Sequence, residues 1–372
     1  MKPTQLTRLT LTDFRSYKAL RFAPQGRINL FTGPNGAGKT NLLEAVSLLV
    51  PGRGLRGAKF SELARRGADA SGSWAIAAQL EDHGQKLEIG TGMAQGAPDR
   101  RVFQLDGEKP RSQAEIGAKL AAVWLTPQMD RLFTETASGR RKFLDRLVVA
   151  LEPSHAREIA AFESAASQRN RLLAEDPDPL WLEALEDTMA RHAVAATATR
   201  AALLAQLNTT LAAGAADPFP RVHLALACAI AAKLGQSPAV AVEDDLRAAY
   251  QRLRRQDSAY RSATLGPQKA DLLITDATTT RPAALSSTGQ QKAMLLGIVL
   301  GHAALIAAAR GTAPLLLLDE PLVHLDAAHR AALFAALQNL TLAAWITGTD
   351  PEPFAALRAD CYTISDGLIT AL

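Results

Sequence analysis

The chain has 372 residues, of which 48% are hydrophobic and only 5% aromatic, and its formal net charge is +4. This length can bury a large core and indicates two domains or one large lobe with an insertion, while the mild charge permits nucleic-acid binding without arguing for it. Cys228 and Cys361, far apart in the sequence, exclude a disulfide framework and a metal-ligand spacing, which fits a reducing compartment.

No segment has the pattern of a secretion signal or a membrane span. The N-terminus, MKPTQLTRLTLTDF, lacks an apolar core of signal-peptide length. The longest apolar run, Met294 to Ala309, contains Gly301 and His302 and is shorter than the ~20 residues that a span requires. We therefore expect a soluble, cytoplasmic protein with no membrane contact, in which this run forms a buried helix.

The first part of the chain has the periodicity of strands. Leu6, Leu9 and Leu11 alternate with polar residues, which predicts a strand on a half-buried sheet. A second predicted strand, residues 27–32, runs into Gly33, and residues 41–49 have helical spacing. Further short strands are predicted at residues 74–77, 86–89 and 101–105.

From about Ser138 the pattern becomes helical, and strands return near Leu272. A strand is also predicted within the helical region, at 221–226, and an apolar strand suited to the middle of a parallel sheet at 315–318. We expect an α/β fold in which residues 1–135 and 264–372 form one lobe and residues 136–263 form an inserted, mainly helical lobe. The predicted helices of that insertion are 138–151, 154–174, 179–213 and 242–255.

Residues 33–40, GPNGAGKT, match the P-loop pattern G-x-x-x-x-G-K-[ST] between a predicted strand and a predicted helix. Its glycines allow backbone N–H groups to converge on a phosphate, Lys39 adds a charge at the β- and γ-phosphates, and the Thr40 hydroxyl completes the shell of Mg²⁺. The ATP-binding residues expected from this segment are Gly33, Asn35, Gly36, Gly38, Lys39, Thr40 and Asn41.

A second motif, residues 315–320, reads LLLLDE and matches a Walker B strand. Asp319, leaving a buried strand, is expected to hold Mg²⁺, and Glu320 to polarise the attacking water. Gln128, which ends a predicted strand before the helical insertion, matches the Q-loop glutamine that ligates Mg²⁺; the alternative is an ordinary turn glutamine. The expected catalytic residues are thus Lys39, Asp319, Glu320 and Gln128.

The ABC subclass is indicated by residues 287–291, STGQQ, which resemble the S-x-G-Q signature motif. Ser287, Gly289 and Gln290 would lie at a helix N-terminus, where a hydroxyl and backbone amides form an anion site. In ABC proteins the γ-phosphate bound there belongs to the opposite subunit; the alternative is a simple N-cap. Asp326, in the D-loop-like PLVHLD, is expected to reach across the dimer.

The switch position differs from that of transporters. Residues 345–350, WITGTD, contain no histidine to contact the γ-phosphate. Thr347 or Thr349 can donate a hydrogen bond there, although not as a cation. We therefore expect slow ATP hydrolysis.

The sequence resembles the RecF family of bacterial recombination mediators, relatives of SMC heads, over its whole length. One departure is GPQKAD at residues 266–271, where the family usually has GPHRDD. By analogy with SMC heads, one of Arg15 and Arg56 is expected to contact the ATP phosphates, with Arg15 the candidate chosen; the alternative is a surface arginine. The matching segments are LTDFRSY (11–17), GPNGAGKTNLLE (33–44), GRGLR (52–56), GRRKFLD (139–145) and GPQKAD (266–271).

The resemblance implies an ATP-dependent homodimer that binds double-stranded, gapped or junction DNA and acts with RecO and RecR to load RecA. Such a protein serves DNA repair, recombination, replication restart and the SOS response. Basic clusters fit phosphate contacts; the alternatives are solvated helix faces or, in the second cluster, pairing with acids. The DNA-binding candidates are Arg53, Arg56, Arg140, Arg141, Arg254 and Arg255.

Two other functions compete with this interpretation. A transporter ATPase subunit is disfavoured by the missing switch histidine and the large insertion. A structural SMC-type ATPase needs hundreds of heptad residues between P-loop and signature motif, whereas Lys39 to Ser287 leaves room only for a compact lobe.

Overall fold

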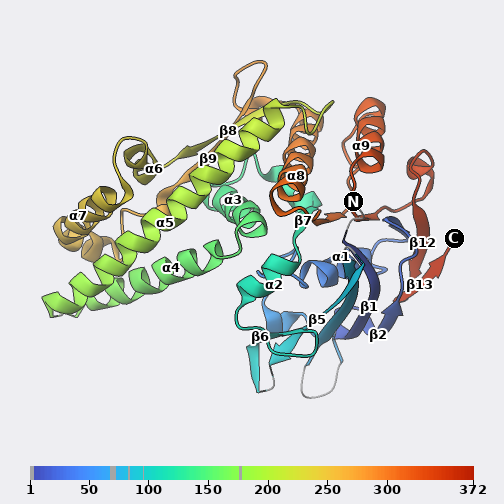
Figure 1. Ribbon diagram of the computed structural model, residues 1–372, viewed down its shortest axis with the longest axis horizontal. Helices are drawn as coiled ribbons and strands as arrows, with labels where there is room; N and C mark the ends of the chain where they lie inside the picture. The colour runs from blue at the N-terminus through green and yellow to red at the C-terminus, as the bar shows by residue number, and fades with distance from the viewer. Residues whose placement is uncertain (1–3, 68–72, 83, 95, 176–177) are drawn as a thin grey trace. The chain divides into compact units, whose positions relative to one another are not determined.

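The computed structural model describes residues 4–67, 73–82, 84–94, 96–175 and 178–372 (Figure 1). The chain divides into two compact units. The first, called here the ATPase unit, comprises Met1–Arg131, Thr210–Val222 and Leu285–Leu372, and the second, the helical unit, comprises Leu132–Thr209 and His223–Ala284.

These boundaries differ from the expected ones in three places, of which the shortest is residues 132–135, which lie in the helical unit. Residues 264–284 lie in the helical unit, because β9 (Asp271–Asp276) pairs with β8 (Val222–Ala227). Residues 210–222 lie in the ATPase unit, where the ring of Phe219 stacks on His329 with centroids 6.4 Å apart. The two longer differences arise from contacts between segments distant in the sequence.

The ATPase unit contains a six-stranded sheet of order β13-β12-β3-β11-β10-β7, parallel except for the β12–β13 pair. The four leucines of β10 are fully buried between β11 and β7, so the predicted apolar parallel strand is confirmed, although it lies beside the edge strand β7 and not in the middle of the sheet. The strands are β3 (Ile28–Thr32), β7 (Ala122–Leu125), β10 (Leu315–Leu318), β11 (Ala344–Thr347), β12 (Asp360–Ser365) and β13 (Leu368–Ala371).

A second, antiparallel sheet of the same unit has five strands in the order β2-β1-β4-β5-β6. The alternation of Leu9 and Leu11 with polar residues directs both leucines inward, and both are fully buried. The short strands expected between residues 74 and 105 are confirmed, although each is longer than predicted. The strands are β1 (Gln5–Phe14), β2 (Tyr17–Phe22), β4 (Ala75–Asp82), β5 (Gln85–Ala94) and β6 (Ala97–Leu105).

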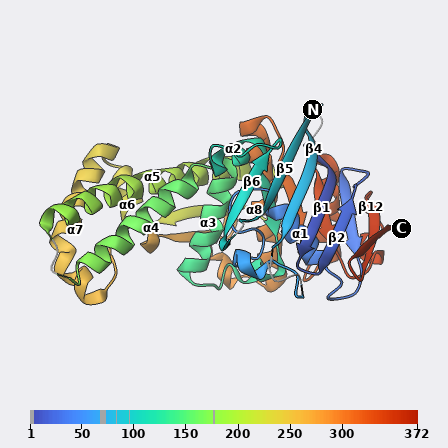
Figure 2. The ribbon, with the colours of Figure 1, turned by 90° about the horizontal axis from the view of Figure 1, so that it is seen from below.

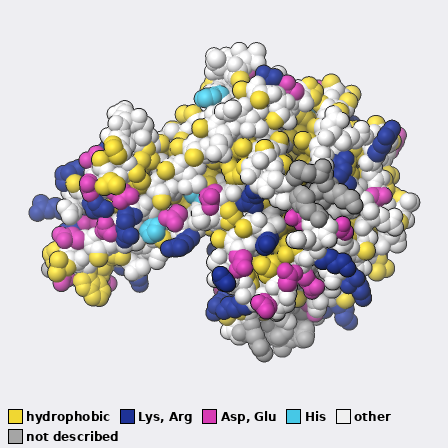
Figure 3. All heavy atoms as spheres, in the orientation of Figure 1, with side chains coloured by type: hydrophobic (Ala, Val, Ile, Leu, Met, Phe, Trp, Pro, Cys, Tyr) yellow, Lys and Arg dark blue, Asp and Glu magenta, His cyan; other side chains and the backbone are white. Residues whose placement is uncertain are grey.

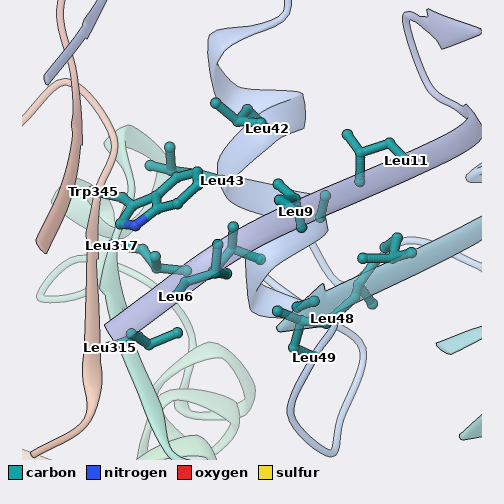
Figure 4. Close-up of a cluster of buried hydrophobic side chains, with 14 of the residues drawn as sticks. Leu6, Leu9, Leu11, Leu42, Leu43, Leu48, Leu49, Leu315, Leu317 and Trp345 are labelled. Carbon is teal, nitrogen blue, oxygen red and sulfur yellow. The ribbon is translucent and has the colours of Figure 1, made fainter. Parts of the chain in front are cut away.

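Helix α1 (Lys39–Ser47) packs into a core shared by both sheets (Figure 4). Leu42 and Leu43 lie with leucines of β1, with Leu317 of β10 and with Trp345 of β11. This core fixes the helix that follows the P-loop. The unit's other helices are α2 (Gln113–Lys119), α8 (Thr288–Arg310), α9 (Ala327–Asn339) and the 3₁₀ turns η1 (Phe60–Glu62), η2 (Pro127–Arg131), η4 (Ala283–Leu285, at the unit boundary) and η5 (Glu352–Phe354).

Helix α8 is the one described helix long and apolar enough to cross a membrane by composition. However, 78% of its most apolar window is buried inside the protein. It is therefore a core helix, as predicted from the run Met294 to Ala309.

In the helical unit, α4, α5 and α7 lie side by side (Figure 2). Phe162, Met189 and Tyr250, one from each helix, form part of its core. The expected insertion helices are confirmed to within a few residues. The elements are α3 (Ala137–Leu151), α4 (His155–Leu172), α5 (Pro179–Ala212), α6 (Ala229–Leu234), α7 (Ala239–Tyr260), η3 (Pro267–Lys269) and the β8–β9 pair.

Candidate nucleotide-binding site

The P-loop joins β3 to α1 in a backbone conformation that requires glycine. Gly33, Gly36 and Gly38 have φ of 144°, 86° and 107°. A Cβ at Gly33 would lie 2.4 Å from the backbone oxygen of Ile364, so no side chain fits there. Tyr17 supports the loop by donating a hydrogen bond of 3.0 Å to the carbonyl of Gly38, and burial raises the pKa of Tyr17, which keeps the phenol protonated.

Lys39, the first residue of α1, folds back over the loop. Its Nζ donates to the carbonyls of Gly33 at 2.7 Å and Pro34 at 3.0 Å. The ammonium group is therefore held at the centre of the glycine loop, where a point charge can act on phosphate oxygens.

The Walker B acid lies directly beside the P-loop threonine. Thr40 Oγ1 is 3.0 Å from Asp319 Oδ1, although the two residues are far apart in the sequence. Hydroxyl and carboxylate oxygens at one point are the hard ligands that Mg²⁺ prefers, usually completed by water and substrate phosphates. These two predicted metal ligands thus fit the ion.

Thr347, the last residue of β11, has a role that the sequence did not reveal. Its hydroxyl donates to Asp319 Oδ1 at 2.7 Å and accepts from the backbone N–H of Glu320 at 3.0 Å. Thr347 is fully buried, and Glu320 has the left-handed φ of 48°. One hydroxyl thus fixes both acidic residues, and Thr347 is directed at Asp319 rather than outward as a phosphate donor.

Gln128 lies in the exposed turn η2, directly after β7. Strand β7 runs parallel to β10, and the backbone N–H of Asp319 donates to the carbonyl of Leu125 at 2.9 Å. Because parallel strands end at the same edge of a sheet, Gln128 and Asp319 emerge on the same side. This placement is that of the expected Q-loop.

The signature segment begins α8 with a capping box. Ser287 Oγ accepts from the N–H of Gln290 at 3.3 Å, and Gln290 Oε1 accepts from the N–H of Ser287 at 3.1 Å. In the single chain Ser287 is therefore the N-cap of α8, which was the alternative interpretation, and the side chain of Gln290 takes part in this cap. Ser287 remains exposed, and Gly289 lies so near the carbonyl of His324 that a Cβ would be 3.1 Å from it.

Asp326 is the N-cap of α9 and accepts from the backbone N–H of His329 at 2.8 Å. This hydrogen bond lowers the pKa of Asp326. The carboxylate is exposed, so it is accessible to another molecule; its role across a dimer remains a prediction.

Arg15 forms a bidentate ion pair with Glu44 at 2.8 and 2.9 Å, and Glu44 is completely buried. Arg56 lies 3.6 Å from the same carboxylate and donates to Asn41 Oδ1 at 2.9 Å. Arg15 is thus anchored to the P-loop helix rather than free on the surface, and Asn41 is engaged by Arg56. The sequence motifs did not identify Glu44 as a site residue. A carboxylate among the apolar residues on the core face of a helix could have indicated that it has a cationic partner.

The DNA-binding candidates divide by their partners. Arg140 pairs with Asp271 at 2.7 Å, Arg141 donates to the carbonyl of Ala270 at 2.7 Å, and Arg254 pairs with Glu186 within the helical unit. The Arg140–Asp271 ion pair confirms, for Arg140, the alternative that the second basic cluster pairs with acids. Over the visible face of the helical unit, Lys and Arg are interspersed with Asp and Glu (Figure 3). Arg53 and Arg255 are exposed.

The chain is similar to known proteins over most of its length. The family described as "RecF/RecN/SMC N terminal domain" matches residues 5–350. The DNA replication and repair protein RecF of Mesorhizobium japonicum is 44% identical over 372 residues, covering 98% of this chain and 97% of its own. The DNA replication and repair protein RecF of Agrobacterium fabrum is 43% identical over 371 residues, covering 98% of this chain and 98% of its own.

Solved structures share the fold. The recombination mediator RecF-ATPrS in the RecFOR pathway superposes with a TM-score of 0.87 at 23% identity, covering 100% of this chain and 99% of that one. An Smc head bound to the C-winged helix domain of ScpA gives 0.55 at 16% identity, covering 99% and 96%.

Proposed function

Because the chain belongs to the RecF family of DNA replication and repair proteins, a branch of the ABC-type ATPases, we propose that shared ATP closes two copies into a dimer on gapped or junction DNA. The dimer would act in the cytoplasm with RecO and RecR to load RecA. The close relatives support this function over a transporter subunit or a structural SMC protein.

One observation carries the proposal: the P-loop and Walker B segments meet, whereas the signature-like segment begins a separate helix. The P-loop and Walker B strand meet at the Thr40–Asp319 contact of 3.0 Å. Ser287 lies exposed at the N-terminus of α8, where backbone N–H groups favour an anion. A second copy is then the natural source of the γ-phosphate for that helix end.

In the proposed dimer, the P-loop amides and Lys39 hold the triphosphate of one copy. Mg²⁺, held by Thr40, Asp319 and Gln128, would neutralise charge on the phosphates. Glu320 orients water for attack, and Thr347 keeps its backbone in place. The missing switch histidine removes a cation from the γ-phosphate, which supports slow hydrolysis.

The energetics follow from shared binding. ATP carries roughly four negative charges and is bound by groups of both copies only in the dimer. Its affinity for the dimer therefore exceeds that for the monomer, and mass action drives association. Hydrolysis removes the shared γ-phosphate and releases the pair. Exposed Arg53 and Arg255 would contribute to non-specific phosphate contacts with DNA.

The test is the size of the purified protein without nucleotide, with ADP and with ATP, each with and without gapped duplex DNA. Only ATP should produce dimers. Lys39→Met should abolish them together with ATP binding, whereas Ser287→Arg should bind ATP and remain monomeric. Dimerisation of Ser287→Arg with ATP would contradict the shared site.

A further inference from the structure

A part-buried ion pair, whose lysine is buried, connects the Q-loop to the signature helix within the ATPase unit. Lys292, near the start of α8, is 1% exposed, and its Nζ lies 2.7 Å from Asp130 Oδ1 in η2. We infer that Lys292 and Asp130 are positioning residues that couple a protomer's own nucleotide to the Ser287 it presents to the other copy. This inference rests on the proposed function of shared ATP.

Stability alone does not explain a lysine at this place. The residues that follow on α8, Ala293 to Ala303, are buried, and nearly all of them are apolar. A buried ion pair is often no more stable than apolar side chains of similar volume, because both charges lose their hydration. Unlike a methionine at the same position, the lysine makes a directional contact with one particular carboxylate.

On one side of the pair, the connection to the nucleotide is short and stiff. Asp130 and Gln128 belong to the same 3₁₀ turn, which is closed by the hydrogen bond from Met129 N–H to the carbonyl of Thr126 at 3.0 Å. The strand before this turn is bonded to Asp319 through Leu125. A shift of Gln128 toward a metal–nucleotide complex would therefore move Asp130 with it.

On the other side, the first turn of α8 is equally rigid. Gln291 N–H donates to the carbonyl of Ser287 at 2.8 Å, and the Gln291 side chain donates to the carbonyl of Ser286 at 2.9 Å. The capping box closes the same turn. A displacement of Lys292 is thus transmitted to Ser287 through hydrogen-bonded helix.

The consequence is cooperativity between the composite sites. ATP in one copy would set the position of that copy's Ser287, which completes the site holding the ATP of the other copy. Each site therefore influences the other through its own Asp130–Lys292 pair, and nucleotide binding to the dimer should be sigmoidal.

The experiment compares the full-length protein with the double variant Asp130→Asn/Lys292→Met, which removes both charges and leaves no unpaired ion in the core. Affinity of the monomer for a fluorescent ATP analogue should change little. ATP-driven dimerisation, followed by sedimentation, should weaken by at least about fivefold, the lower end of ordinary coupling. The Hill coefficient for ATP should fall toward one.

A matched control is Asp145→Asn/Arg200→Met in the helical unit, because this ion pair is similarly exposed. The side chains of Arg200 and Asp145 are 3% and 24% exposed, and those of Lys292 and Asp130 are 1% and 21% exposed. It should lower the melting temperature yet dimerise as the wild type does. Equal loss of dimers in both double variants would overturn the inference, as would loss of monomer ATP binding in the first.

The outcomes also separate this inference from the proposed function. A wild-type chain that stays monomeric with ATP would overturn the proposed function. A wild type that dimerises, beside an Asp130→Asn/Lys292→Met variant that dimerises equally well and cooperatively, would overturn only the coupling.

Discussion

Thr347→Val tests whether one buried hydroxyl organises the Walker B acids. Valine has a similar shape but removes the donor to Asp319 at 2.7 Å and the acceptor for the N–H of Glu320 at 3.0 Å. The first is a hydrogen bond to a carboxylate, and the second leaves a backbone donor without its partner in a buried environment.

The magnitude follows from these two losses. A hydrogen bond to a charged group contributes about 1.5–3 kcal/mol, and an unsatisfied buried donor costs about 1–3 kcal/mol. We expect the free energy of unfolding to fall by about 3 kcal/mol. If about half of this also affects the orientation of Glu320 in the transition state, kcat should fall about tenfold, since 1.4 kcal/mol corresponds to a factor of ten.

The assay is phosphate release at saturating and limiting ATP, with urea denaturation of the same preparations. The KM for ATP should change little, because the P-loop and Lys39 contacts are untouched. Thr347→Ser, which keeps the hydroxyl, is the matched control and should retain most activity. A Thr347→Val enzyme with wild-type kcat and stability would refute the reasoning.

Three further predictions concern other parts of the chain. Glu320→Gln should stop hydrolysis and leave ATP-held dimers persistent in gel filtration; normal turnover would assign water activation elsewhere. The hydrogen bond from Arg140 lowers the pKa of Asp271. The ion pair therefore stabilises the folded protein fully at pH values above the ordinary aspartate pKa of about 3.9, and this stabilisation is lost as the pH falls through the lowered pKa. Wild type and Arg140→Gln should therefore differ in unfolding free energy at about pH 6, and the difference should shrink as the pH falls through the lowered pKa of Asp271; a difference that stays constant with pH would exclude this linkage. Arg255→Gln should weaken DNA binding and lower the slope of log affinity against log salt concentration by about 0.9 per lost phosphate contact. Arg254→Gln breaks an ion pair with a buried carboxylate and should mainly lower stability. If instead Arg254→Gln weakened DNA binding and Arg255→Gln did not, the exposed arginine would not be the DNA contact.

The sequence predicted best what depends on neighbouring residues. The strand, glycine loop and helix around Lys39 are adjacent in the chain, and the loop's positive φ values are ones that glycine adopts without strain. The apolar strand before Asp319 is likewise a local pattern, and the structure places it inside the parallel sheet, between β11 and β7. These elements carry most of the candidate site.

What the sequence did not predict depends on which distant segments meet. Glu44 and Asp271 bind Arg15 and Arg140, and although pairing with acids was one alternative for Arg140, only the folded chain identifies these partners. Thr347 faces Asp319 because β11 lies beside β10 in one particular register. No periodicity encodes that register, so a buried orienting hydroxyl looked like a possible phosphate donor.

The position of β3 has a consequence for how the protein is made. Ile28–Thr32 is buried along its whole length, yet its sheet neighbours are β11 and β12, from the last part of the chain. During translation this apolar strand leaves the ribosome long before its partners, which lie far later in the chain. Such long-range pairing slows folding and exposes strand edges to aggregation, so the nascent chain should depend on chaperones until its C-terminal strands are complete.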